Sequence, residues 1–337
     1  GHAGMDEFLH HPLRSPLTFK RGALLAVLLV LAGCSRSAED FSIILGGDVM
    51  LSRAGEPMFE KDSDPWGEST TALNAADFFL INLESPLGES TSTPGEMNLC
   101  ADQDQIDLLL QAGVDLASLS NNHQDDCQPG GLQQTAGLLA GSGIRSTGLN
   151  YEPAYIETKG GVKIAVIAAN EITGSLDETS LMNSIGAAHE NTELVIVSMH
   201  WGNEYQAGAD VRQETLAQEM ADAGADVIWG HHPHVLQRME WLNASDGRKV
   251  LALYSLANLL ADQRMLTDTQ QSALVRLTFS GGTIKSIEII PIGMMDRGTR
   301  LYIIDDMKTV EKIGERLQIS QLSAEHPEIE IQLINGD

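Results

Sequence analysis

Short apolar runs alternate with helical segments along this chain of 337 residues, and polar side chains lie within a few residues of the ends of five of the runs. Runs with the length and composition of buried strands cover residues 41–45, 77–81, 114–119, 162–169, 194–199, 226–229 and 250–255. Helical spacing of apolar residues covers residues 102–112, 131–140 and 212–223. Strands that alternate with helices predict an α/β fold built in layers.

The segments between and after these runs are also predicted from composition. The first strand is expected to stop at Gly46 and Gly47. Residues 85–98 are rich in Ser, Thr, Pro and Gly, which predicts a surface loop. Residues 272–292 are typical of a β-hairpin that completes a sheet. Residues 306–337 predict a helix and a short strand, with no residues that suggest chemistry.

Five predicted strands end in polar residues of the types that bind metals. These residues are Asp48, Glu84, Asn122, His200 and the cluster of His231, His232 and His234. In α/β folds, binding sites form beyond the carboxyl ends of the strands. The agreement across five strand ends therefore predicts one shared site.

Three histidines in four positions suggest metal binding, because neutral imidazole is the commonest protein metal ligand. Together with Asp, Glu and Asn oxygens, they form a ligand set suited to Zn, Mn or Fe. A carboxylate can bridge two cations that activate a water molecule, and Glu84 is the candidate bridge. The Asn122 amide oxygen would complete one site, leaving His123 free as a general acid or as an oxyanion partner.

Each of these residues also has a purely structural interpretation. Asp48 could cap a helix, Asn122 could occupy a turn, and His200 could be a packed core histidine. Asn258 is expected to hold a turn or to support a ligand. Arg53 could pair with an anionic substrate, or could be a solvated surface arginine.

The N-terminal segment has the parts of a secretory signal. Basic residues precede a short apolar run at residues 22–30, which is too short to span a bilayer comfortably. Residues 31–34, Leu-Ala-Gly-Cys, resemble a bacterial lipobox, which implies cleavage before Cys34 and lipidation of its thiol. Ser35 favours the outer membrane if the cell has two membranes. Residues 1–4, ahead of Met5, are interpreted as an added sequence or an upstream start.

Two cysteines remain after Cys34 is assigned to the lipid. Cys100 and Cys127 could form a disulfide in an oxidising compartment, bracing the segment that holds Asn122 and His123. Two unpaired buried thiols are the alternative.

Charge excludes several classes of partner. Loss of residues 1–33 removes three basic and two acidic side chains, leaving 18 basic and 45 acidic ones and a net charge of −27. Such a chain is repelled by nucleic acid and by anionic lipid surfaces. No serine-hydrolase elbow, phosphate-binding P-loop or dinucleotide fingerprint follows the first predicted strand, which argues against nucleotide cofactors.

The motifs also resemble those of a known family. Gly-Asp-Val-Met at 47–50, Asn-Leu-Glu at 82–84, Ser-Asn-Asn-His at 120–123, His-Trp-Gly-Asn-Glu-Tyr at 200–205, Gly-His-His-Pro-His at 230–234 and Tyr-Ser-Leu-Ala-Asn-Leu at 254–259 occur in its order. In this respect residues 41–295 resemble the CapA/PgsA family of bacterial poly-γ-glutamate capsule proteins. That family is similar to calcineurin-like metallophosphoesterases, which implies an α/β/β/α two-sheet sandwich flanked by helices and a dinuclear metal centre.

The resemblance implies a role for each matching residue. Asp48 would bind the first metal, Glu84 would bridge, Asn122 would bind the second metal, and His123 would be catalytic. The two sites would be completed by His200, His232 and His234. Glu204 would support the site, whereas the resemblance assigns no role to the neighbouring His231.

Three positions depart from the family pattern. Metallophosphoesterases usually carry a histidine two residues after the first Asp, where this chain has Met50. One site is therefore expected to be weak, or to be occupied only in the presence of substrate. The departure also favours a binding protein or a site with a single ion. Ala257 stands where a glycine is expected, and Leu259 replaces an aromatic residue, which bears on the local backbone rather than on the metals.

The expected organisation is a lipoprotein signal over residues 1–33, a linker over 34–40, a CapA-like domain over 41–295 and a C-terminal extension or cap over 296–337. The expected protein is exported and lipid-anchored to the cell membrane or outer membrane. It would be a metal-dependent hydrolase or transferase acting on a γ-glutamyl polymer, or a related acidic substrate, beside membrane-embedded capsule synthase subunits. The alternatives are a non-catalytic scaffold that binds polymer or synthase, and a general surface metallophosphatase.

Overall fold

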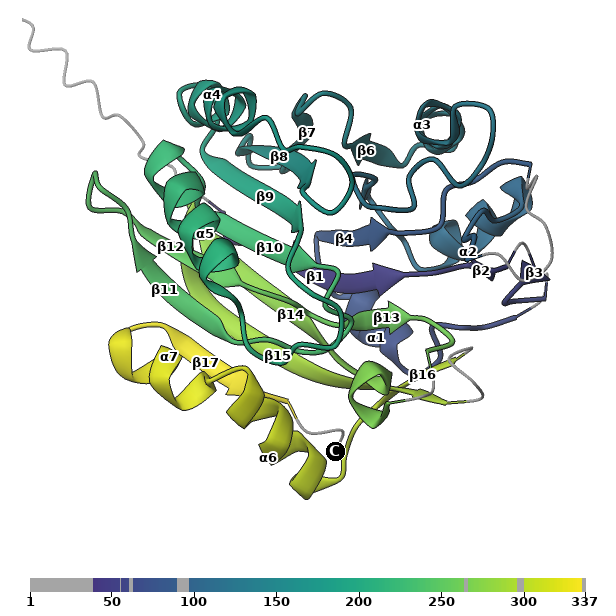
Figure 1. The fold of residues 1–337 in the computed structure, drawn as a ribbon. Helices are drawn as coiled ribbons and strands as arrows, with labels where there is room; N and C mark the ends of the chain where they lie inside the picture. Colours follow the sequence, from purple (N-terminus) through teal and green to yellow (C-terminus); the bar gives the residue numbers. More distant parts are fainter. Residues whose placement is uncertain are drawn as a thin grey trace, which may run out of the picture. The chain divides into compact units, whose positions relative to one another are not determined.

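The computed structural model describes residues 39–54, 56–60, 63–89, 97–263, 266–295 and 300–334. Within these ranges the chain builds two large sheets (Figure 1). The nine-stranded sheet has the order β16 (Arg300–Ile303), β15 (Thr283–Met295), β14 (Gln271–Ser280), β1 (Phe41–Val49), β4 (Phe78–Leu83), β5 (Leu116–Ser118) and β6 (Arg145–Thr147), with β13 (Asn258–Leu260) beside β1 and β17 (Glu330–Leu333) beside β15.

The second sheet has six strands. Its order is β11 (Met239–Asn243), β12 (Lys249–Leu253), β10 (Val227–His231), β9 (Leu194–His200), β8 (Lys163–Asn170) and β7 (Ala154–Glu157). The four inner strands run parallel, and the two edge strands are antiparallel to their neighbours. A separate ribbon pairs β2 (Ser52–Arg53) with β3 (Glu56–Pro57).

The described helices are α1 (Ser69–Asn74), η1 (Gln103–Gln105), α2 (Ile106–Gln111), α3 (Gly131–Gly141), α4 (Glu178–His189), α5 (Val211–Ala223), η2 (Thr267–Gln270), α6 (Met307–Arg316) and α7 (Ile319–Glu325). Helices α1 to α5 cover the outer faces of the two sheets. Apolar side chains of α1, α2 and α3 pack on the nine-stranded sheet, and those of α4 and α5 pack on the six-stranded sheet. A third apolar cluster fills the space between the sheets. The fold is therefore the predicted α/β/β/α sandwich.

Strand β10 illustrates how alternation builds the layers. Val227 and Trp229 point into the core between the sheets, whereas Ile228 points toward the helices on the opposite face. The indole of Trp229 donates a hydrogen bond to the backbone oxygen of Gly46 at 2.8 Å, which ties the two sheets together. By the same alternation, His231 lies on the inner face of the sheet, toward β1.

Helix α5 carries its boundaries in its sequence. Asp210 caps its N-terminus by accepting a hydrogen bond from the Gln213 N–H, and the Gln213 side chain in turn accepts from the Asp210 N–H. Gly224 ends the helix with a φ of 128°, a positive value that residues with a Cβ atom rarely adopt. The helix predicted at 212–223 is confirmed, and it begins one residue earlier than predicted, at Val211.

The prediction that the first strand stops at the two glycines was wrong. Strand β1 continues through them to Val49, so that Asp48 lies within the strand. A Cβ atom on Gly47 would lie 2.1 Å from the backbone oxygen of Ala257. The glycines therefore permit close approach of the neighbouring backbone instead of ending the strand.

The prediction of a surface loop from residue 85 was also wrong for its first part. Ser85 and Leu87 are fully buried. Leu87 forms an isolated bridge with Ala101, and its N–H donates to the Thr135 hydroxyl at 2.8 Å. The rest of the predicted loop includes residues 90–96, which lie outside the described residues.

The C-terminal residues extend both the sheet and the core. Strands β16 and β17 pair with two successive stretches of β15 along the edge opposite β14, and the segment lies along the sheet in yellow in Figure 1. Helices α6 and α7 add Val310, Ile313 and Leu322 to the apolar cluster between the sheets. Residues 37–337 form one compact unit.

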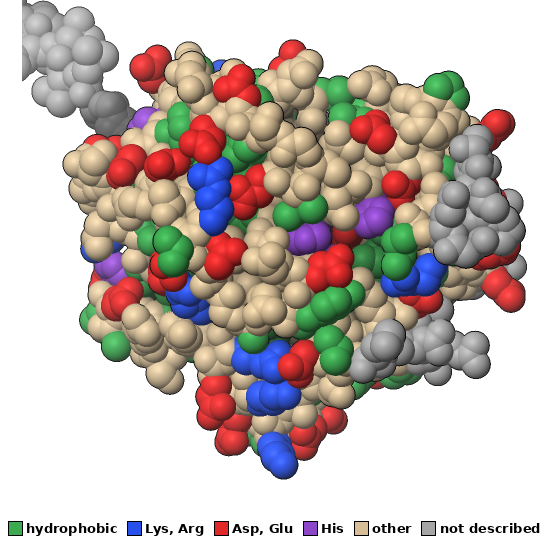
Figure 2. All heavy atoms as spheres, viewed as in Figure 1, with side chains coloured by type: hydrophobic (Ala, Val, Ile, Leu, Met, Phe, Trp, Pro, Cys, Tyr) green, Lys and Arg blue, Asp and Glu red, His purple; other side chains and the backbone are tan. Residues whose placement is uncertain are grey.

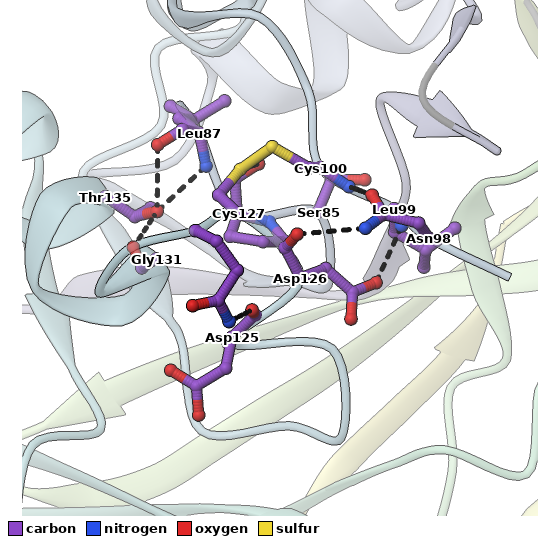
Figure 3. The surroundings of a disulfide bond; sticks show 12 residues. Ser85, Leu87, Asn98, Leu99, Cys100, Asp125, Asp126, Cys127, Gly131 and Thr135 are labelled. Carbon is purple, nitrogen blue, oxygen red and sulfur yellow. Dashed lines mark hydrogen bonds between the residues drawn. A yellow bond between two sulfur atoms is a disulfide. The ribbon is translucent and has the colours of Figure 1, made fainter. Parts of the chain in front are cut away.

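Cys100 and Cys127 are joined by a disulfide, which is one of the two arrangements that the sequence left open (Figure 3). The bond closes a segment with a sequence separation of 27 residues. Cys34 and the predicted signal lie outside the described residues. Among the described helices, none has the length and apolar character needed to cross a membrane.

The surroundings of Gly47 and Gly137 predict opposite effects on stability when each glycine is replaced by alanine. We expect Gly47→Ala to lower the free energy of unfolding by about 1–3 kcal/mol, because the new methyl group would displace backbone. Gly137 is an exposed glycine in α3 with nothing within 4 Å of an added Cβ. Gly137→Ala should therefore raise the free energy of unfolding by about 0.5–1 kcal/mol. Urea unfolding measures both, and equal effects would contradict the close contact at Gly47.

The disulfide predicts a larger effect on stability. Replacing both cysteines, as in Cys100→Ala with Cys127→Ala, should lower the free energy of unfolding by about 3–4 kcal/mol, because the loop would no longer be closed in the unfolded chain. Urea unfolding under non-reducing conditions provides the measurement. A reductant should lower the unfolding midpoint of the wild type but leave that of the double variant unchanged.

Candidate metal centre

Polar side chains from both sheets converge at the carboxyl ends of the parallel strands. In the first sheet, Asp48 of β1 stands in register with Asn82 of β4 and with Asn258 of β13. In the second sheet, His231 of β10 stands in register with His200 of β9. Parallel pairing brings the strand ends to one edge of each sheet, and the sandwich places these edges face to face.

Asp48 is fully buried and surrounded by donors. Its Oδ1 accepts from the Asn82 amide at 2.8 Å, and its Oδ2 accepts from the His232 N–H at 3.2 Å. Nδ1 of His231 lies 3.0 Å from Oδ1, and Nδ1 of His234 lies 3.2 Å from Oδ2. Burial alone would raise the pKa of Asp48, but the two imidazoles outweigh it and hold the pKa well below its usual value. The carboxylate is therefore ionised.

Glu84 is fully buried, and neither of its carboxylate oxygens has a hydrogen-bond partner among the described residues. Its Oε1 lies 3.8 Å from Nε2 of His200, 3.8 Å from Nε2 of His234 and 4.0 Å from Nε2 of His123. These gaps are too long for hydrogen bonds. Burial is the main cause that raises the pKa of Glu84 to about 7. A buried carboxylate without a donor fits a position that receives a cation.

Two three-residue groups share Glu84. One contains Asp48, Glu84 and His234, and the other contains Glu84, His200 and His232. Within each group the potential ligand atoms lie within 4.8 Å of one another. This arrangement fits two cations bridged by one carboxylate, which matches the predicted position of Glu84.

The second group has a further oxygen beside it. Oδ1 of Asn122 lies 2.7 Å from Nε2 of His200. Burial lowers the pKa of His200 well below its usual value. Burial and the nearby His234 also lower the pKa of His232 to about 4. Both rings are therefore neutral at physiological pH and have a lone pair to offer, as metal ligation requires.

His234 is electrostatically different from the other two histidines. Burial would lower its pKa, but the negative charges of Glu84 and Asp48 outweigh burial and raise the pKa of His234 to about 9. The two carboxylates thus stabilise a positive charge at His234, which either a proton on the ring or a bound cation can supply. Asn258 orients the ring, since its Oδ1 lies 2.9 Å from Nδ1 of His234 and its amide donates to the Thr269 oxygen at 3.1 Å. Asn258 therefore supports His234.

Backbone conformation at the site is unusual. His232 has a φ of 94° and His234 a φ of 56°, so both ligand candidates sit in the left-handed region. Such residues cost about 1–3 kcal/mol each and cluster at functional sites. Ala257, where the family pattern has glycine, has a φ of 62°. A glycine would adopt this φ without strain, which explains why the family pattern has glycine at this position. In this chain an alanine adopts the same conformation.

The other predicted residues lie around this centre. His231 is buried between Asp48 and the Trp229 ring and belongs to neither group. Glu204 is exposed and forms a third possible group with His232 and His234. Arg53 forms an ion pair with Asp262 at the rim, so its side chain is not simply solvated.

His123 has a partner that the sequence analysis missed. Its Nδ1 lies 2.8 Å from Oδ2 of Asp126, three residues later. Burial lowers the pKa of His123, but the Asp126 hydrogen bond and the charge of Glu84 outweigh it and raise the pKa above its usual value. Asn82, beside Asp48, was also missed. Its position two residues before Glu84 was the available signal.

A cavity of about 530 Å³ opens next to the centre. It is lined by Met50, Arg53, Met97, Leu99, His123, Glu204, Tyr205, His234, Asp262, Gln263, Leu266 and Thr269. Met50, which replaces the family's histidine, is buried against Leu99 and contributes to the cavity wall. A second hollow of about 420 Å³ lies beside His232 and Arg212. Figure 2 shows histidine side chains reaching the surface near the middle of this face, with acidic side chains beside them.

Comparison with known proteins extends these observations. The chain is similar to the PGA biosynthesis protein CapA of Bacillus subtilis, with 28% identity over 73% of this chain and 70% of the relative. It is 27% identical to the capsule biosynthesis protein CapA of Bacillus anthracis, over 77% of this chain and 69% of the relative. A probable polyglutamine synthesis accessory protein of Mycobacterium tuberculosis is 24% identical over 57% of this chain and 68% of its own length.

A solved structure shares the fold. A hypothetical protein from Thermus thermophilus superposes with a TM-score of 0.51 and 16% identity, over 74% of this chain and 98% of that chain. The family described as bacterial capsule synthesis protein PGA_cap matches residues 42–263, which include every metal-ligand candidate described above. The match spans most of the sandwich, and the chain therefore belongs to the PGA_cap family of bacterial capsule synthesis proteins.

Proposed function

We propose that this chain is an exported, lipid-anchored, metal-dependent hydrolase or transferase in the synthesis of a poly-γ-glutamate capsule. Family membership and the names of the two Bacillus relatives support the pathway. The observation that carries the chemistry is Glu84, a buried carboxylate without a hydrogen-bond donor among the described residues, shared by two groups of ligand candidates. Anchoring would be through Cys34, in the cell membrane or the outer membrane.

The chain's residues would hold two divalent ions (Mn, Zn or Fe). Asp48 and His234 would bind the first ion, and Asn122, His200 and His232 the second, with Glu84 between them. When bound, such ions supply the positive charge that activates a water molecule and polarises an acyl or phosphoryl oxygen. Neutral His200 and His232 offer lone pairs without losing a proton first, which favours binding at physiological pH.

His123 would act as the general acid. Its ring borders the cavity, and its Nε2 is directed toward Glu84 at 4.0 Å. A side-chain exposure of 15% leaves the ring open to a ligand in the cavity. Asp126 and Glu84 raise the pKa of His123 above its usual value, which favours the protonated ring that a general acid needs.

The cavity indicates what kind of substrate fits. Its wall combines apolar Met50, Leu99 and Leu266 with Arg53, which is paired with Asp262 at the rim. A γ-glutamyl chain presents methylene groups that match the apolar wall, and its carboxylates would compete with Asp262 for Arg53. Elsewhere the chain's strong negative charge disfavours a polyanion, so the ligand would be guided to the metal ions and Arg53. Capsule synthase subunits in the membrane would be the protein partners.

One observation favours a second function. Met50 occupies the position where metallophosphoesterases carry a ligand histidine, and its buried side chain forms part of the cavity wall. A centre with one weakened site suits a non-catalytic scaffold that holds polymer or synthase. A general surface metallophosphatase is a third candidate, which predicts broad turnover of small phosphoesters.

Metal content of the purified full chain tests the centre. We expect about two equivalents of Mn, Zn or Fe in the wild type by mass spectrometry. Glu84→Gln should lose most of both ions, because the bridge serves both groups. Glu219→Gln, which makes the same change at an exposed position of α5, is the matched control and should retain both. One equivalent in the wild type would show that Met50 has removed a site, and none after metal addition would overturn the proposed metal centre.

Turnover separates the enzyme from the scaffold. We expect His123→Ala to retain its metals and to lower kcat by about 10²- to 10⁴-fold, the usual contribution of a general acid. The assay would offer γ-glutamyl amides, γ-glutamyl oligomers and p-nitrophenyl phosphodiesters in parallel. Binding of the oligomers without turnover of any compound by the metal-loaded wild type would favour the scaffold. Turnover restricted to small phosphoesters would favour the general phosphatase.

A further inference from the structure

We propose that Asp126 is the positioning residue for His123, and that the segment 98–100 holds Asp126 in place through two hydrogen bonds and the disulfide. The inference rests on the proposed function, since it concerns the residue that would deliver the proton. Neither the family motifs considered above nor the ligand groups include Asp126. It lies in the loop after β5, outside the metal centre itself.

The contact between His123 and Asp126 determines which ring nitrogen of His123 carries hydrogen. Nδ1 of His123 lies 2.8 Å from Oδ2 of Asp126, a hydrogen-bond distance. An ionised carboxylate can only accept, so Nδ1 must donate and carry hydrogen. Nε2 then faces Glu84 and the cavity, on the opposite side of the ring. Asp126 thereby selects both the ring orientation and the tautomer of His123.

The backbone of His123 is fixed separately. Its N–H donates to Oδ1 of Asn121 at 3.0 Å, and the Asn121 amide donates to the Leu83 oxygen at 2.9 Å. These bonds tie the loop to the end of β4, directly before Glu84. They define where the Cα atom of His123 lies, but they leave rotation of the ring free. Asp126 supplies the constraint on the ring.

Asp126 is itself held by the segment 98–100. The Leu99 N–H donates to Asp126 Oδ2 at 2.7 Å, and the Asn98 amide donates to the Asp126 backbone oxygen at 2.9 Å. The next residue, Cys127, is bonded to Cys100 of the same segment (Figure 3). Three links over three residues therefore clamp Asp126 to the segment that also supplies Leu99 to the cavity wall. These links connect the cavity wall at Leu99 to the orientation of the His123 ring.

Asp125 provides a matched control. It is an exposed aspartate in the same loop, and among the described side chains its carboxylate accepts a hydrogen bond from Gln124 alone, at 3.4 Å. Figure 3 shows it directed away from the disulfide and from Leu99. Asp125→Asn and Asp126→Asn thus make the same change of charge in adjacent positions, but only one of them touches the His123–Asp126 pair.

The first measurement is long-range ¹H–¹⁵N NMR of the full chain labelled at histidine, with His123 assigned by comparison with His123→Ala. We expect the wild-type ring to be protonated at Nδ1. In Asp126→Asn, the ring should show mixed tautomers, while Asp125→Asn should match the wild type. An unchanged His123 pattern in Asp126→Asn would overturn the inference, whether or not the protein turns over any substrate.

The second measurement is turnover of a substrate found with the wild type. Asp126→Asn should lower kcat by roughly 10- to 100-fold with little change in KM, less than the loss expected for removal of the whole general acid. Metal content and unfolding midpoint should match those of Asp125→Asn. If His123→Ala lowers kcat and Asp126→Asn does not, the inference fails while the proposed function stands. If neither variant lowers kcat, the proposed role of His123 fails.

Discussion

The burial of Glu84 is the constraint on which the site depends. A carboxylate removed from water without hydrogen-bond donors is unfavourable unless positive charge lies beside it. Three imidazoles stand about its Oε1 at distances too long for hydrogen bonds, and Asp48 adds a second buried carboxylate nearby. The site therefore concentrates negative charge and lone pairs around a position that suits cations. We regard this electrostatic demand as the main physical argument for a metal centre.

The sandwich makes this burial possible. Glu84 follows a strand of one sheet, whereas His200 and His232 come from strand ends of the other, and the inter-sheet core holds the two edges together. The bond from Trp229 to the Gly46 oxygen joins the same two strands, β10 and β1, that carry His231 and Asp48. Close backbone approach at Gly47 and left-handed conformations at His232, His234 and Ala257 are the local costs of this geometry. Packing elsewhere in the molecule must offset them.

Much of the fold could be read from periodicity. The strands rich in apolar residues and the helices α3 and α5 lie near their predicted positions, because burial on both faces or on one stripe leaves a clear pattern. Helix α4 was not predicted: Leu181, Ile185 and Ala188 form its buried face, but the Asn, Ser and Gly residues between them have low helix propensity. The glycines at 46 and 47 and the segment after Ser85 were misread, because their composition is typical of breaks and loops while their roles depend on neighbours distant in sequence.

The sequence by itself determined the residue types at the strand ends, the α/β alternation and the family motifs. Those were enough to nominate Asp48, Glu84, Asn122 and the histidines as one cluster. Only the tertiary structure decided which of them face one another, that Glu84 is shared between two groups, and that Cys100 is bonded to Cys127. Only the tertiary structure showed that Asp126 contacts His123 and that Met50 lines the cavity. The physical reason is that side-chain partners are set by the pairing and packing of strands, which a linear pattern does not record.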